Sequence, residues 1–219
     1  MNFERDIQTI LETPNLFVVL GGDIIDNQIK HLSGLLASRT RPGTQWKWLR
    51  RFLRRIRPKL VACISGNHDA WTALLTDLDL LEFETSDLGI PYDQDELTLK
   101  VQMTDAEYVV GLRHKYPGGS KANPALKVKN WWRDGDTDFD VGVVCHDHTA
   151  VIEPFVRHGR VRWAMRPGTY QTESRYAIRE GYHCPIPATP VAVFQPFKKD
   201  VHGFLSLDWG GRYLRGVSG

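Results

Sequence analysis

The sequence predicts an α/β fold, because short apolar runs typical of buried strands alternate with segments whose apolar residues recur at helical spacing. A second observation is that four of the apolar runs are followed directly by histidine, aspartate or asparagine. With 219 residues, 42% of them hydrophobic, the chain is long enough to bury one large core. No internal repeat, low-complexity segment or linker interrupts it, so we expect a single domain over residues 1–219.

The first half of the chain is expected to alternate helices and strands. In "FERDIQTILET" apolar residues recur three or four positions apart, and Pro14 ends the helix. "TQWKWLRRFLRRIRP" repeats this spacing and ends at Pro58. "LFVVL" and "KLVACISG" are unbroken apolar runs bounded by glycine, which predicts buried strands. "DAWTALLTDLDLL" is expected to form one helix.

The second half is expected to be mainly strand. "LTLKVQM" and "AEYVVGL" are predicted to pair, and "DVGVVCH" is predicted to be buried. "TAVIEPFVRHGRVRWAM" is predicted to be a hairpin that turns near His158 and Gly159. The remaining strands are expected in "PVAVFQPF", "HGFLSLDW" and "GRYLRG", around one short helix near "TESRYAIRE".

Composition excludes several classes of protein. The formal net charge of +2 gives no global field of the kind that marks an obligate nucleic-acid or membrane binder. Three cysteines are too few for a disulfide framework and favour a reducing compartment, so we expect them to be small buried hydrophobes. No basic leader and no apolar stretch of about 18 residues occurs, and we therefore expect a cytoplasmic protein without a membrane span.

Polar side chains follow four of the predicted strands, in "GGDIID", "SGNHD", "RHKYPG" and "CHDHT". The carboxyl ends of strands border the usual ligand crevice of an open α/β sheet, so these clusters are expected to converge. A carboxylate there is costly to desolvate without a positive partner, and we expect that partner to be a metal. Imidazole, carboxylate and amide donors suit manganese, zinc, iron or cobalt.

Each cluster taken alone has a structural alternative. Asp23 would serve as a helix cap, "GNHD" as a polar turn, "HDH" as an exposed loop, and His114 as a surface residue. The order of all four, each after a strand, favours a functional site.

In this order the motifs Gly22-Asp23-Ile24-Ile25-Asp26, Gly66-Asn67-His68-Asp69, His114 and Cys145-His146-Asp147-His148 resemble those of calcineurin-like metallophosphoesterases. The resemblance covers roughly residues 1–170. It implies a two-sheet β-sandwich flanked by helices, in α-β-β-α layers, with a two-metal site at the strand ends.

The resemblance also implies a role for each site residue. Asp23 would bridge two metals, with Asn67, His114 and His146 completing one of them and His148 binding the other. His68 would face the substrate, oriented by Asp69, and would stabilise or protonate the leaving oxygen. The implied cofactors are one or two divalent ions per chain, manganese first, then zinc, iron, cobalt, nickel or magnesium.

Two features depart from the family pattern. Cys145 replaces a glycine, a small change at a strand end. The family's first strand, which ends in D-x-H and supplies an Asp and a His to the metal of His148, has no counterpart. The only aspartate before Asp23 is Asp6, in a predicted helix. The fold is therefore expected to lack that strand, which an upstream segment or a second chain would have to supply.

The expected function is hydrolysis of phosphate esters. Phosphodiesters or nucleic acid are expected as substrates ahead of phosphomonoesters. The alternative is an inactive or weakly active family member that serves as a binding or assembly module. The basic helix at residues 44–57 would follow a phosphate backbone or simply present a solvated face. Trp131 and Trp132 would stack on bases or, as we favour, pack in the core. No membrane partner is expected.

Overall fold

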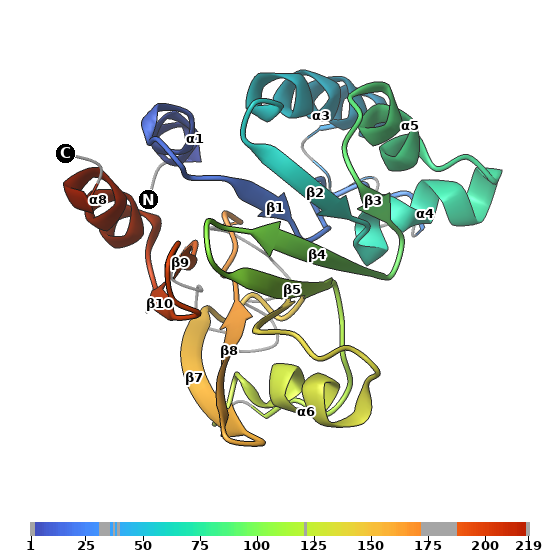
Figure 1. Ribbon diagram of the computed structural model, residues 1–219. Helices are drawn as coiled ribbons and strands as arrows, with labels where there is room; N and C mark the ends of the chain where they lie inside the picture. Colours follow the sequence, from blue (N-terminus) through green and yellow to red (C-terminus); the bar gives the residue numbers. More distant parts are fainter. Residues whose placement is uncertain are drawn as a thin grey trace. The chain divides into compact units, whose positions relative to one another are not determined.

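The structure is a computed structural model that describes residues 3–30, 36, 38, 40–120, 122–171 and 188–217 (Figure 1). The chain forms two compact units, one of Phe17–Leu97 and one of Met1–Leu16 with Thr98–Gly219. Both combine helices with sheets, so the predicted α/β class is confirmed. The helix predicted near residues 172–180, and Cys184, lie outside the described residues.

The Phe17–Leu97 unit contains a parallel sheet of order β1-β2-β3. The strands are β1 (Val18–Leu20), β2 (Leu60–Ile64) and β3 (Tyr92–Asp93), and the helices are α3 (Pro42–Ile56), α4 (Asn67–Thr76) and α5 (Leu80–Asp87). The sequence predicted β1, β2 and α3, but it did not predict the two-residue β3. Helix α3 buries Leu49, Leu53 and Ile56 at the predicted helical spacing, and this confirms its apolar face.

The single helix predicted over residues 69–81 is two helices, so that prediction was wrong. Helix α4 ends at Thr76 because Asp77 adopts the left-handed conformation, with φ of 58°. Asp79 then caps α5, where its side chain accepts hydrogen bonds from the backbone N–H groups of Leu81 and Glu82. Aspartate is well suited to both positions, and the two together interrupt an otherwise helical pattern.

The other unit is built on a five-stranded sheet of order β4-β5-β6-β8-β7. Its strands are β4 (Glu96–Gln102), β5 (Glu107–Arg113), β6 (Val141–Val144), β7 (Val151–Arg157) and β8 (Arg160–Arg166). Strands β5, β6 and β8 run parallel, and β7 pairs with β8 as the predicted antiparallel hairpin. All five strands were predicted, whereas helix α6 (Leu126–Asp134) was not.

Helix α6 completes the core of this unit. Trp131 is 1% exposed and packs with Val128, Phe139 and Ala164, which confirms the expected packing role of this tryptophan. A Cβ on Gly111 would lie 2.6 Å from the Trp131 ring, so the bare glycine lets the ring lie close to β5.

Three further elements complete the unit: a hairpin of β9 (Val191–Phe194) and β10 (Val201–Phe204), and the helices α1 (Phe3–Glu12) and α8 (Leu207–Val217). The sequence predicted α1, β9 and β10. It wrongly assigned residues 207–209 and 211–216 to strands, because the glycines of α8 obscured the helical pattern. A Cβ on Gly210 would lie 2.6 Å from the Cβ of Val191, so this glycine allows α8 to lie close to β9.

Within the described ranges, no strand precedes β1. None of the helices in those ranges combines the length and apolar character needed to cross a bilayer.

Candidate metal centre

Two glycines bring the loops after β1 and β2 into contact. Gly22 has φ of +83°, and a Cβ there would lie 2.4 Å from the backbone nitrogen of Gly66. A Cβ on Gly66 would in turn lie 2.1 Å from the backbone nitrogen of Asp23. No side chain fits between the two loops, so glycine at both positions places Asp23 against the start of α4.

Asp23 lies at the first turn of α4. Its Oδ1 accepts a hydrogen bond of 2.9 Å from the backbone N–H of His68. The residue adopts a left-handed backbone conformation, with φ of 52°, which aspartate tolerates better than most side chains. Asp23 therefore contacts the N-terminal turn of a helix, where backbone N–H groups favour negative charge. Asn67 is the first residue of the same helix.

Asp69 holds the two loops together. Its carboxylate accepts hydrogen bonds from the backbone nitrogens of Gly66, at 3.0 Å, and Ile24, at 3.2 Å. The side chain is buried, and burial raises the pKa of Asp69 to about 6, with the charge of Asp23 adding to the rise and the backbone donors opposing it. Asp69 was expected to orient His68. In the structure its carboxylate accepts from backbone groups of both loops, and the orienting role stays a prediction.

Asp26 contacts the His68 ring. The Nδ1 atom of His68 lies 2.5 Å from the backbone oxygen of Asp26 and 3.7 Å from its Oδ1. The ring also packs against Trp71, with 4.2 Å between ring centroids. These contacts fix the orientation of the imidazole.

Asn27 is a positioning residue that the sequence did not reveal. It is fully buried, and its Nδ2 donates a 2.7 Å hydrogen bond to the backbone oxygen of His68. Its own backbone N–H donates to Oε1 of Gln45, in α3, at 2.8 Å. The only available signal was a polar residue directly after the aspartates, and an ordinary surface turn has the same pattern.

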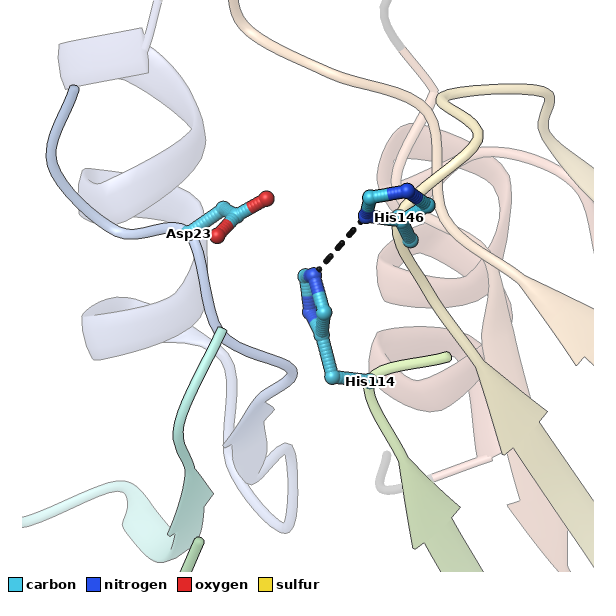
Figure 2. Close-up of side chains that lie close together, drawn as sticks. All are labelled: Asp23, His114 and His146. Carbon is cyan, nitrogen blue, oxygen red and sulfur yellow. Dashed lines mark hydrogen bonds between the residues drawn. The ribbon is translucent and has the colours of Figure 1, made fainter. Parts of the chain in front are cut away.

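The second group of site residues lies at the ends of β5 and β6 in the other unit. These strands are parallel neighbours in which Arg113 pairs with Val144, so their carboxyl ends adjoin. His114 follows β5 and is 6% exposed, and its Nε2 lies 3.1 Å from Nδ1 of His146 (Figure 2). The structure thus brings together two of the predicted ligands. Asp23, also drawn in Figure 2, belongs to the Phe17–Leu97 unit.

The loop after β6 is tightly turned. His146 and His148 both have left-handed backbones, with φ of 73° and 57°. Asp147 between them forms ion pairs with Nζ of Lys127 at 2.6 Å and with Arg166 at 2.7 Å. Although burial opposes it, the hydrogen bond from Lys127 and the charge of Arg166 lower the pKa of Asp147 below its ordinary value. These two ion pairs hold the loop that presents both histidines.

Each unit therefore contributes donor atoms of a kind that binds divalent metals. One provides the carboxylate of Asp23 and the amide of Asn67, and the other provides imidazoles from His114 and His146, which face one another at ring nitrogens. Imidazole nitrogens with carboxylate and amide oxygens suit borderline and hard divalent ions. The donor types present in each unit fit such an ion.

The calcineurin-like phosphoesterase family model matches residues 2–176, and the chain belongs to this family. The match confirms the resemblance noted from the motifs, all of which lie within the matched residues. No curated protein matches the sequence. Among solved structures, the chain is similar to wild-type Vps29 complexed with Zn²⁺ from Entamoeba histolytica, with 15% identity, a TM-score of 0.32, and coverage of 71% of this chain and 87% of that one. A TM-score this low supports no inference about function.

Proposed function

We propose that this chain is a cytoplasmic, metal-dependent phosphoesterase that hydrolyses phosphodiesters, nucleic acid included, ahead of phosphomonoesters. The observation that carries the proposal is the pairing of His114 with His146 at adjacent strand ends, in a chain of the calcineurin-like phosphoesterase family. Two imidazoles facing one another at 3.1 Å, with one of them buried, are a costly arrangement for a merely structural role.

In this proposal Asp23, Asn67, His114 and His146 would hold one divalent ion, and His148 would contribute to a second. Manganese is our first choice, ahead of zinc, iron, cobalt, nickel and magnesium. Such ions, when bound, neutralise phosphate oxygens and activate a water molecule as the nucleophile. The donor types support the assignment, because carboxylate and amide oxygens with imidazoles match the preferences of these metals.

His68 would donate the proton to the leaving oxygen. Because Nδ1 faces the backbone oxygen of Asp26, that nitrogen carries the proton in the neutral ring, and protonation at Nε2 makes the ring an acid. Contact with Trp71 limits rotation of the imidazole. Asp69 and Asn27 would support this geometry by holding the loops around His68.

The structure offers little support for nucleic acid as the main substrate. On α3, Arg50 forms an ion pair with Glu84 at 2.7 Å, and Arg54 forms one with Asp87 at 3.2 Å. These two arginines already have partners within their own unit, which favours the solvated-face interpretation of this helix. Nucleic acid therefore remains one example within the wider class of phosphodiesters.

The proposal is tested by manganese-dependent hydrolysis of bis-(p-nitrophenyl) phosphate, compared with the p-nitrophenyl monoester. We expect weak turnover of the diester, and we expect His68→Ala to lower it by about 10² to 10⁴-fold. The proposal would be overturned if none of the named metals supported turnover.

A second candidate is a non-catalytic binding or assembly module, and one observation favours it. Asp6, the only aspartate before Asp23, is buried in α1 and accepts a 2.9 Å hydrogen bond from the hydroxyl of Tyr170. It is used structurally, so it does not replace the D-x-H motif. In this proposal an upstream segment or a second chain would supply the missing strand and its ligands.

A further inference from the structure

Helix α4 and the turn after it carry an apolar stripe that faces solvent. Trp71, Leu74 and Leu75 follow helical spacing, which in a globular protein normally marks a buried face, and Leu78 follows in the turn after the helix. Yet Leu74 is 76% exposed, Leu75 61% and Leu78 42%. Only Asp69 is buried in α4, so this helix buries a carboxylate and exposes its leucines.

A second element adds to this surface. Helix α5 follows α4 after three residues and contacts it (Figure 1). Its Phe83 is 66% exposed. Single exposed apolar residues are common and need no explanation. Four large ones within ten residues of sequence, Leu74, Leu75, Leu78 and Phe83, are different, because exposed clusters of this kind mark interaction sites. We call these four residues the α4–α5 apolar patch.

The charges around the patch indicate what would bind there. Residues 67–87 contain six acidic residues and no lysine or arginine. Four of the six already have partners, since Asp69 and Asp79 bond to backbone N–H groups and Glu84 and Asp87 pair with arginines of α3. Asp77 and Glu82 are exposed and form no ion pair within the described ranges. The patch therefore combines apolar area with unneutralised negative charge.

We propose that the α4–α5 apolar patch docks an amphipathic helical segment of a partner protein, with apolar residues at helical spacing and lysine or arginine at its flanks. In this mode of recognition a few apolar anchors at helical spacing supply the affinity and flanking charges supply orientation. An anionic membrane surface fits less well, because it would face Asp77 and Glu82 with charge of the same sign.

The same helix connects the patch to the proposed active site. His68 lies in the first turn of α4, and its ring packs against Trp71 at the start of the stripe. A partner on the patch would contact the same helix that carries this histidine. The docking proposal rests only on exposure and charge, so it does not depend on phosphoesterase activity.

The test uses a synthetic helical peptide with leucines at helical spacing and lysines on its opposite face, and measures its binding to the whole chain by calorimetry. We expect the double variant L74E/L75E to bind this peptide at least about tenfold more weakly than the wild type. The matched control is V156E/V161E, in the β7–β8 hairpin, where the two valines are 61% and 58% exposed and pair across the strands. This control should bind as the wild type does.

Three results would overturn the proposal: unchanged affinity of L74E/L75E, equal affinity for a peptide with glutamates in place of the lysines, or binding of anionic vesicles in preference to the peptide. Circular dichroism checks that both variants fold. If L74E/L75E does not fold, the docking site is tested by hydrogen exchange of the wild type instead. The peptide is then expected to slow amide exchange within residues 67–87. Absence of that protection also contradicts the docking site.

Discussion

The side chain of His68, proposed to transfer a proton, is held by several neighbouring groups. Its Nδ1 faces the Asp26 backbone oxygen, its ring packs on Trp71, and its own backbone oxygen accepts from Asn27. An imidazole held in this way is suited to proton transfer, and it has no place in the proposed ligand set. This difference separates the role of His68 from that of the histidines at the ends of β5 and β6.

The first prediction concerns that difference. His68→Ala should lower turnover of the diester by about 10² to 10⁴-fold, the range usual for general acid–base catalysis, and leave bound metal nearly unchanged. Elemental analysis of the dialysed variant beside the kinetic assay checks both expectations. Loss of metal in the variant would make His68 a ligand and would overturn its assigned role.

The second prediction concerns Asp69. Asp69→Ala leaves the buried N–H of Gly66 and the partly buried N–H of Ile24 without their acceptor, so the free energy of unfolding should fall by about 1–3 kcal/mol for each group left unsatisfied. Asp69→Asn is the matched control, because its amide oxygen still accepts one bond and no charge is buried. Urea unfolding of the metal-free protein measures both. Equal loss in the two variants would mean that the carboxylate does not act as this acceptor.

At the scale of elements, the site depends on strands that end in glycine-containing loops. The loops after β1 and β2 approach one another so closely that only glycine fits at positions 22 and 66. In the other unit, strand register takes this part. The parallel pairing of β5 and β6 sets His114 beside His146. The strands set the spacing of the site, and the loops supply its chemistry.

The third prediction tests this close approach. Gly66→Ala should remove metal binding or destabilise the fold, because the new Cβ would lie 2.1 Å from the Asp23 nitrogen and 2.2 Å from its carboxylate oxygen. Gly43→Ala, in the first turn of α3, is the control, since a Cβ there meets nothing within 4 Å. Thermal unfolding and metal content should be affected in the first variant alone. A Gly66→Ala protein with wild-type metal content would show that the loops can separate without loss of the site.

The fourth prediction concerns strand β2. Burial raises the pKa of the Cys63 thiol well above its ordinary value, with the nearby acids adding to the rise, and Cys145 after β6 is also buried. The thiolate is the reactive form, so neither cysteine should be alkylated by iodoacetamide in the folded protein. Peptide-resolved mass spectrometry, with a guanidinium-unfolded sample as reference, measures this. Rapid labelling of Cys63 in the folded sample would contradict the buried position of β2.

At the scale of the whole molecule, the residues proposed as metal ligands are far apart in sequence. One proposed metal has four ligands in this chain, namely Asp23, Asn67, His114 and His146. The other has only Asp23 and His148, whereas protein sites for a divalent ion usually supply at least three ligands. We therefore expect the two proposed sites to differ strongly in affinity.

The fifth prediction follows from this difference. The 219-residue chain should retain about one equivalent of divalent metal after dialysis and should be weakly active alone. Elemental analysis against protein concentration measures the equivalents. Two retained equivalents would refute the half-site and would require ligands that the motifs do not identify.

Most of the strands were predictable from sequence because their signal is local. Unbroken apolar runs predicted β1, β2 and β6, and a central turn at Gly159 predicted the β7–β8 hairpin. The errors have local causes as well. Asp77 breaks a helical pattern through a backbone conformation that composition does not reveal, and the glycines of α8 obscure a helix that close packing on β9 requires.

By itself, the sequence determined the α/β class, the family and the identity of the candidate ligands, since residue type and order along the chain suffice for these. The tertiary structure decided which side chains meet. It assigned Asp69 to backbone groups and Asp26 to His68, added Asn27 as a support, and placed His114 next to His146. The physical reason is that a hydrogen bond depends on distances of about 3 Å between atoms that the fold brings together, and sequence spacing does not fix such distances.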